Sequence, residues 1–347
     1  VSATATSIDV FANSASGELD PNGTPASGDE VAAVVLNWAT AIDFQTGDAF
    51  DADPVVVLGE TIDRSSDELR IEGDLTDVNI LDLLTGAVGF EIVSQLVDAD
   101  VDGVAGKDLD EATLLTLGFD LNEPAGPETR SLWAGVDGVG LRLLDGQIRI
   151  AALAPASDLD DRRWLAVDAD GISGDVNVAG ITVTASGMNV SFNTASGTGA
   201  TALDWNAAVD LDETASTFGA DVVLILGQPL TLTGERLEIG GTLSLNLFGF
   251  VHGTVTFDFS RLIVDVELPG GLEILADATL MTFDLSVIDL TIGIPGGIGF
   301  TIDTGSLGLS IVLPKLPTVG IDTRRWISVE GLLAGRGDQT VARKQVA

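Results

Sequence analysis

The amino-acid sequence predicts an all-β protein made of two tandem β-rich repeat units in an elongated arrangement. Apolar and polar residues alternate with a period of two through most of the chain, as in strands with one buried face. Gly, Pro, Asn and Asp interrupt these runs at short intervals, which is typical of turns between strands. Several short sequence motifs also occur twice, in the same order. We expect each unit to form a sandwich, an open barrel or a broad β-solenoid.

The repeat is clearest around two tryptophans. Trp164 follows Arg162 and Arg163, and Trp326, 162 positions later, follows Arg324 and Arg325. Because several anchors keep their order at similar offsets, we divide the chain into residues 1–178 and 179–347 and expect the halves to superpose. The remaining matches are Leu69–Gly73 with Leu237–Gly241, Ala112–Leu117 with Ala278–Phe283, Ile8–Val10 with Met188–Val190, Asn13–Gly17 with Asn193–Gly197, and Leu36–Trp38 with Leu203–Trp205.

The strand pattern varies along the chain. Stretches 91–97 and 110–117 have weak helical spacing, but the stretch matching the first, 257–266, is rich in β-branched and aromatic residues and favours strands. The run 222–226 is apolar at every position, which predicts a strand covered on both faces. Residues 17–30 are polar and rich in Gly, Pro and Ser, so we expect an exposed loop there. The tail 336–347 is polar and net basic.

Composition excludes several classes of function. The chain carries 53 acidic and 16 basic residues, a net charge of −37, which opposes the phosphate neutralisation that nucleic acids require. Divalent cations or a basic partner suit this charge. Cysteine is absent, so disulfides and thiolate chemistry are excluded. No apolar run is long enough to predict a transmembrane helix.

The strongest chemical motif is an acidic loop that suits calcium. Carboxylates alternate from position 98 to position 102 and are followed by Gly103, which permits a sharp turn around a hard cation. The second unit has Pro269 at the matching point, so we expect calcium only in the first unit. The alternative is a solvated acidic hairpin loop. The predicted metal ligands are Asp98, Asp100, Asp102, Asp108 and Asp110.

Other conspicuous residues favour structural roles. One arginine before each tryptophan is expected to lie on the ring or to pair with a carboxylate. His252, the single histidine, has no Ser–His–Asp pattern around it. No carboxylate pair is singled out by spacing, and the Gly-rich stretches lack a following helix. We therefore predict no catalytic residues and no enzymatic activity.

Several sequence motifs resemble segments of very large, repetitive secreted or cell-surface proteins of aquatic bacteria. The resemblance is carried by the Arg-Arg-Trp lines, by 139–146 and by 190–197, and it covers most of the chain. It implies an extracellular or cell-surface location, an adhesive or matrix role and the use of calcium. It assigns no functional residue.

These observations predict a structural or adhesive repeat segment, such as a subunit of a filament, sheath or surface layer. The alternative is a binding module that holds a lipid or glycan in an apolar β-groove. The chain begins in a strand pattern, residues 1–10, so we expect it to be a segment of a longer protein. An unpaired end strand invites pairing, which predicts head-to-tail contact with neighbouring copies or adjacent repeats.

Overall fold

The computed structural model describes residues 2–19, 31–45, 49–57, 59–65, 67–104, 106–122, 130–136, 139–211, 218–269, 274–294, 298–315 and 322–338. Within these ranges the regular structure consists of strands, with no helix. The predicted all-β class is therefore confirmed. It follows that no helix of the described chain could cross a membrane.

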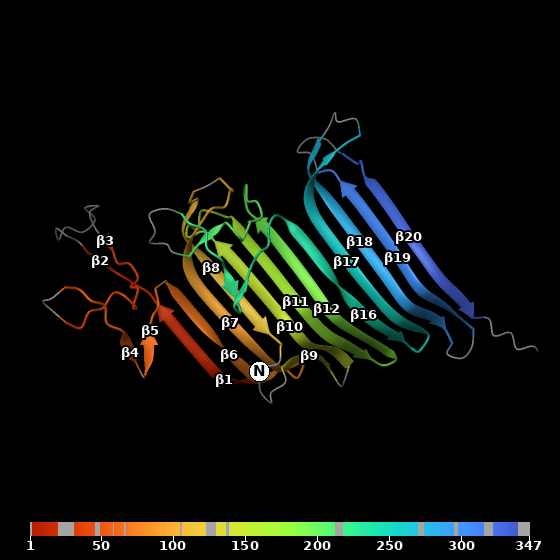
Figure 1. Cartoon of the computed structure of the whole chain (residues 1–347), viewed down its shortest axis with the longest axis horizontal. Coiled ribbons are helices and arrows are strands. Elements are labelled where there is room, and N and C mark those ends of the chain that lie inside the picture. The colour runs from red at the N-terminus through yellow and green to blue at the C-terminus, as the bar shows by residue number, and fades with distance from the viewer. Residues whose placement is uncertain are drawn as a thin grey trace, which may run out of the picture.

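One large antiparallel sheet dominates the molecule (Figure 1). It has fourteen strands, and most of them follow one another in chain order as a meander. The order across the sheet is β1, β6, β7, β8, β10, β11, β12, β16, β17, β18, β19 and β20; β9 pairs with β10 and β7, and β13 pairs with β7. Three further two-stranded ladders, β2–β3, β4–β5 and β14–β15, belong to the connecting segments.

Most strands of the sheet are 12 to 20 residues long. The strands of the sheet are β1 (Ser2–Asn13), β6 (Glu68–Ile80), β7 (Leu84–Ala99), β8 (Leu109–Asp120), β9 (Ser131–Val136), β10 (Val139–Ala154), β11 (Arg163–Val178), β12 (Ile181–Ser196), β13 (Val209–Asp210), β16 (Arg236–Leu247), β17 (Val251–Glu267), β18 (Ile274–Gly293), β19 (Gly299–Leu313) and β20 (Trp326–Asp338). The short strands are β2 (Glu18–Leu19), β3 (Val31–Ala32), β4 (Val55–Val57), β5 (Glu60–Ile62), β14 (Leu224–Ile225) and β15 (Gln228–Pro229).

The sheet continues without a break across the predicted boundary between the two units. Residue 178 ends β11, and β12 begins at Ile181, with Val178 and Ile181 as facing partners. β12 then pairs with β16 on its other side. Both halves thus contribute to one sheet, while the division at residue 178 stays a prediction.

The hydrophobic core lies on one face of the sheet beneath residues 197–235, which we call the cover segment. Figure 1 shows this segment crossing in front of β7, β8 and β10. We call the face beneath it the covered face. Burying apolar surface here is the main stabilising term that the fold offers. The core residues are Val97, Ala99, Val101, Leu109, Ala112, Leu114, Ala151, Leu153, Trp164, Ala166, Leu203, Trp205, Ala208, Val209, Val223, Ile225, Leu230 and Leu232.

Two local predictions have opposite outcomes. Stretches 91–97 and 110–117 lie in β7 and β8, so strand and not helix is confirmed there. The expectation that 222–226 is covered on both faces is wrong: Val223 and Ile225 are buried, but Val222 and Leu224 are more than half exposed. This run lies on top of the sheet and not within it, so only its underside is covered.

The two expected irregular segments lie partly outside the described residues. Of the predicted loop 17–30, only Gly17 to Leu19 are described, and β2 occupies Glu18 and Leu19. Of the basic tail 336–347, residues 336–338 end β20. Arg343 and Lys344 lie outside the described residues.

Candidate functional site

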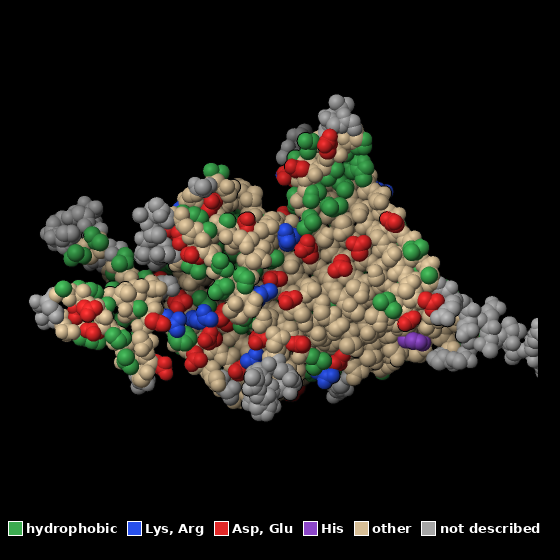
Figure 2. All heavy atoms as spheres, viewed as in Figure 1, with side chains coloured by type: hydrophobic (Ala, Val, Ile, Leu, Met, Phe, Trp, Pro, Cys, Tyr) green, Lys and Arg blue, Asp and Glu red, His purple; other side chains and the backbone are tan. Residues whose placement is uncertain are grey.

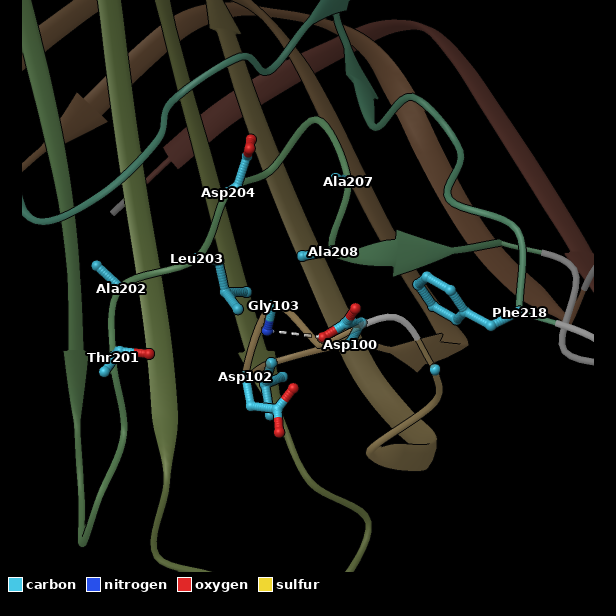
Figure 3. Close-up of a pocket in the computed structure, with 12 residues that line it drawn as sticks. Asp100, Asp102, Gly103, Thr201, Ala202, Leu203, Asp204, Ala207, Ala208 and Phe218 are labelled. Carbon is cyan, nitrogen blue, oxygen red and sulfur yellow. Dashed lines mark hydrogen bonds between the residues drawn. The ribbon is translucent and has the colours of Figure 1, made fainter.

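The acidic loop joins β7 to β8 and brings three of the five predicted ligands together. Asp100, Asp102 and Asp108 each place a carboxylate oxygen within 4.8 Å of the others. Asp100 is partly exposed, and the other two are exposed. Figure 3 shows the side chains of Asp100 and Asp102 close together beside the backbone of Gly103.

Backbone hydrogen bonds fix the shape of this loop. The N–H groups of Val101 and Asp102 donate to Oδ2 of Asp108 at 2.8 and 3.0 Å. The N–H of Gly103 donates to Oδ1 of Asp100 at 2.9 Å, and the N–H of Val104 donates to Oδ1 of Asp102 at 2.7 Å. These are side-chain-to-backbone turns of the kind that Asp favours. One oxygen of each carboxylate therefore accepts hydrogen bonds from the backbone of the loop.

The second oxygen of each carboxylate accepts no hydrogen bond from the described residues. Three carboxylates with oxygens within 4.8 Å of one another have the ligand type that a hard cation such as Ca²⁺ prefers. The mutual repulsion of three carboxylates would also be relieved by a divalent charge. The donor set is thus compatible with calcium.

The other two predicted ligands are taken by a lysine. Lys107 places its Nζ 2.9 Å from Oδ2 of Asp98 and 2.6 Å from Oδ1 of Asp110. Asp98 is buried and Asp110 is exposed. The hydrogen bond from Lys107 holds the pKa of Asp110 below its ordinary value. Sequence reasoning missed Lys107, although the rarity of lysine in this chain was a usable signal.

The cover segment forms the other wall of a hollow beside the loop. Its volume is about 770 Å³. Figure 3 shows residues 201–208 passing above Asp100 and Asp102, with Phe218 at one end. The lining residues are Asp100, Val101, Asp102, Gly103, Gly106, Thr201, Ala202, Leu203, Asp204, Ala207, Ala208 and Phe218. A cation at the three carboxylates would therefore lie next to the core.

The matching loop of the second half lacks an acidic cluster in its described part. Asp265 accepts the N–H of Asp277 at 3.0 Å, as Asp98 accepts that of Glu111 at 3.3 Å. Around Asp265, however, no three metal-ligating side chains converge among the described residues. Among the residues that the structure describes, a group of three such side chains forms in the loop that the sequence predicted for calcium.

An asparagine and a tryptophan hold the cover segment to the sheet, an arrangement we call the Asn–Trp clamp. Trp205 donates its indole N–H to Oδ1 of Asn193 at 3.0 Å. Asn193 donates its amide to the carbonyl oxygens of Leu203 at 2.8 Å and Gly234 at 2.9 Å. Both side chains are fully buried. The clamp thus satisfies several buried polar groups at once.

A corresponding clamp near the N-terminus joins Asn13, the last residue of β1, to the segment 14–67 between β1 and β6. Trp38 donates to Oδ1 of Asn13 at 3.0 Å, and Asn13 donates to the carbonyl oxygen of Leu36 at 3.2 Å. Gly17 and Gly197, which follow the two asparagines, have φ angles of +100° and +99°. That conformation favours glycine and turns the chain away from the sheet.

Further bonds repeat after each clamp. The N–H of Asp53 donates to the carbonyl oxygen of Ile42 at 2.7 Å, and that of Asp221 donates to Val209 at 2.7 Å. The side chains of Asp53 and Asp221 accept the N–H groups of Phe44 and Leu211, both at 2.9 Å. The ladders β4–β5 and β14–β15 then occupy corresponding positions. The described parts of segment 14–67 thus share these local contacts with the cover segment.

The two segments differ in what lies beneath them. Leu203 is 2% exposed, but its counterpart Leu36 is 42% exposed. Ile225 is fully buried, but its counterpart Val57 is 50% exposed. The described residues of segment 14–67 therefore make the contacts of a cover, but these two apolar side chains are not buried against the sheet.

The buried side of the cover segment includes one charged contact. Glu91 of β7 is buried, accepts the N–H of Leu226 at 3.1 Å and pairs with Nη2 of Arg70 at 2.6 Å. Beside it, a Cβ at Gly118 would lie 2.5 Å from Cγ of Leu226. Only glycine permits this approach. Glu91 and Gly118 therefore both help to position the cover segment on the sheet. Neither was singled out from the sequence.

The two Arg-Arg-Trp lines have matching geometry. Arg162 pairs with Asp160 at 2.6 Å and lies 5.6 Å from the ring centre of Trp164. Arg324 pairs with Asp322 at 2.8 Å and lies 5.7 Å from the ring centre of Trp326. The predicted contacts of one arginine with the ring and with a carboxylate are confirmed. Trp164 also donates to the carbonyl oxygen of Thr201 in the cover segment at 2.8 Å.

Comparison with protein-family models, curated proteins and solved structures found no match.

Proposed function

We propose that the chain is a structural or adhesive repeat segment of an extracellular or cell-surface protein, of the kind that forms a filament, sheath or surface layer. One observation carries this proposal. The strand order β1, β6, β7, β8, β10, β11 is followed by β12, β16, β17, β18, β19, β20, and each series starts with an Asn–Trp clamp. A sheet that grows by such units has no intrinsic end.

The described residues support mechanical work better than catalysis. Three of the buried charged side chains are engaged in ion pairs: Arg149 with Asp168 at 2.7 Å, Glu91 with Arg70, and Asp98 with Lys107. The acidic loop is fixed by its own backbone. The proposal therefore assigns no catalytic residue and gives calcium, bound by Asp100, Asp102 and Asp108, the role of stiffening the loop beneath the cover segment.

The test is assembly of the purified chain. Size-exclusion chromatography with light scattering should give a mass that rises with protein concentration. Negative-stain electron microscopy of the concentrated sample should reveal linear particles longer than one chain. The sample is compared in buffer with calcium chloride and in buffer with chelator. Strictly monomeric protein at every concentration, with and without calcium, would overturn the proposal.

A binding module is the second candidate, and one hollow favours it. On the face opposite the cover segment, residues of β8, β10, β11 and β12, most of them apolar or small but including Arg163, surround a space of about 520 Å³. Leu115 and Leu165 are each 37% exposed there. A lipid chain could bury this surface. Native mass spectrometry of the purified chain would reveal a bound lipid or glycan as added mass, which the structural proposal does not expect.

A further inference from the structure

The cover segment lies over strands that precede it in the chain. It follows β12, yet its Val209 pairs with Ala99 of β7, and its core residues pack on β7, β8, β10 and β11. Segment 14–67 follows β1 in the corresponding way. Figure 1 shows β2 to β5 extending beyond β1, on the side away from β6. This segment therefore reaches to where strands preceding β1 would lie.

The other end of the sheet has the complementary deficiency. In the first half, facing partners Leu114, Leu153 and Trp164 are at most 2% exposed beneath the cover segment. In the second half the corresponding row of facing partners is only partly buried, and hydrophobic side chains gather at the raised end of β17 and β18 (Figure 2). That row consists of Leu280, Val312 and Trp326.

The tryptophans make the deficiency specific. Trp164 donates its indole N–H to the carbonyl oxygen of Thr201. The indole N–H of Trp326 has no acceptor among the described residues. Counting from Leu203 and its counterpart Leu36, the residue that corresponds to Thr201 is Val34, which is 67% exposed. One end of the chain thus has an indole donor that lacks an acceptor among the described residues, and the opposite end has an exposed segment that could supply one.

The sheet edges fit the same relationship. Within the described ranges β1 pairs only with β6 and β20 only with β19, so no described strand occupies the other edge of either. Inside the chain, β11 and β12 show how such edges meet, with Val167 facing Phe192. Their counterparts are Val329, which is 63% exposed, and Ala12, which is also exposed. Free edges of this length favour pairing with another strand.

We propose that two copies of this chain join end to end, with residues 31–45 and 49–57 of one copy seated on the covered face of β17 to β20 of the other. β1 of the first copy pairs with β20 of the second, as β12 pairs with β11. Ile42 then lies beside Val266, as Val209 lies beside Ala99, and Trp326 donates to the carbonyl oxygen of Val34. The inference rests on the proposed function and specifies its interface.

The contact is confined to the apolar rows near Trp326. Farther along the same face, Asp258 and Asp284 occupy the positions of Glu91 and Gly118. Asp284 leaves no room for the close approach that Gly118 gives to Leu226. A repeated contact between opposite ends of identical chains is heterologous, so it continues as an open fibre or closes as a ring.

The absence of cysteine permits a direct test. Two single variants, Ile42→Cys and Val266→Cys, are mixed and oxidised. Cβ atoms of facing residues on neighbouring antiparallel strands are close enough for a disulfide. A disulfide-linked dimer containing one chain of each variant is expected. The internal pair Ala99→Cys with Val209→Cys provides the geometric control, since it should close within a single chain. Dimers formed equally by each variant alone, or no mixed dimer, would overturn the interface.

A substitution separates this interface from assembly in general. Leu36→Asp, introduced into the Ile42→Cys chain, should weaken mixed-dimer formation about thirtyfold or more, as loss of a central apolar contact does. It should leave the melting temperature of the monomer unchanged, because Leu36 is already exposed. Filaments that persist while the mixed dimer never forms would overturn this interface and leave the structural proposal standing. Loss of both filaments and dimer in the parent chain would overturn both.

Discussion

Trp205 and Asn193 are joined by a 3.0 Å hydrogen bond from the indole N–H to the amide oxygen, and neither side chain has measurable contact with solvent. The amide of Asn193 also ties down two carbonyl groups of the cover segment. A single side chain thus connects β12 with both ends of the segment that closes the core. Its counterpart pair, Trp38 and Asn13, makes the same bond at a position where the tryptophan is partly exposed.

Replacing Asn193 by alanine should lower the free energy of unfolding by about 3 kcal/mol. The change leaves the Trp205 donor and two carbonyl acceptors without partners, and each buried unsatisfied group costs about 1–3 kcal/mol before relaxation. Asn13→Ala is the matched control and should cost about 1 kcal/mol, because water can reach the Trp38 indole. Urea unfolding followed by tryptophan fluorescence measures both. Equal losses for the two variants would contradict the unequal burial of the clamps.

Leu203→Ala should cost about 2–5 kcal/mol, the usual range for truncating a buried leucine. Leu36→Ala should change monomer stability by less than about 0.5 kcal/mol, because this side chain is substantially exposed. Thermal unfolding at low protein concentration, where copies stay separate, compares them. A large loss for Leu36→Ala under these conditions would mean that segment 14–67 packs on its own chain.

Glu91→Gln should lower stability by about 1–3 kcal/mol, because it removes the charge that Arg70 pairs with inside the fold. Glu72→Gln tests the same arginine from its other side, since Glu72 lies 2.8 Å from Nε of Arg70 but is more exposed. That variant should lose about 0.5 kcal/mol or less. Chemical denaturation of the two variants in parallel gives the comparison. A larger effect at Glu72 would reverse the expected order.

The carboxyl group of Asp160 should remain ionised in unusually acidic solution. Hydrogen bonds from the side chain and then the backbone of Arg162 lower its pKa to about 2. A depressed folded-state pKa stabilises the fold above the unfolded value, about 3.9, and this contribution disappears as pH falls toward 2. Carbon-detected NMR titration should find Asp160 titrating below the unfolded value. In Arg162→Gln the pKa of Asp160 should return toward the unfolded value; an unchanged titration would remove the arginine as the cause.

Calcium should raise the melting temperature through Asp100, Asp102 and Asp108. A ligand at a hundred times its dissociation constant stabilises the native state by about 2.7 kcal/mol. The shift between calcium and chelator should vanish in Asp100→Asn with Asp102→Asn. It should persist in Asp110→Asn, because Asp110 pairs with Lys107 outside the cluster. Identical melting of the parent chain in both buffers would remove calcium from the account.

The sequence predicted the strands because alternation and turn residues are local signals. It also paired Leu36–Trp38 with Leu203–Trp205, but no local signal reveals that Trp205 bonds Asn193 on another strand. The acidic loop illustrates the same limit. Spacing alone grouped five aspartates, whereas the fold divides them between a cluster of three and the two that Lys107 engages. Which carboxylates converge depends on how β7 and β8 pair, and a linear spacing does not contain that information.

The backward reach of the cover segment sets an order of events during synthesis. Each strand of the meander finds its partner as soon as the next one is made, so the sheet can extend in step with the growing chain. Trp164 and its neighbours must nevertheless wait until about residue 235 has left the ribosome before they are shielded from water. During that interval the first half is a folded sheet with one apolar face exposed to water. Any factor that holds the nascent chain would find its target there, and a chain truncated before Leu203 would keep that target permanently.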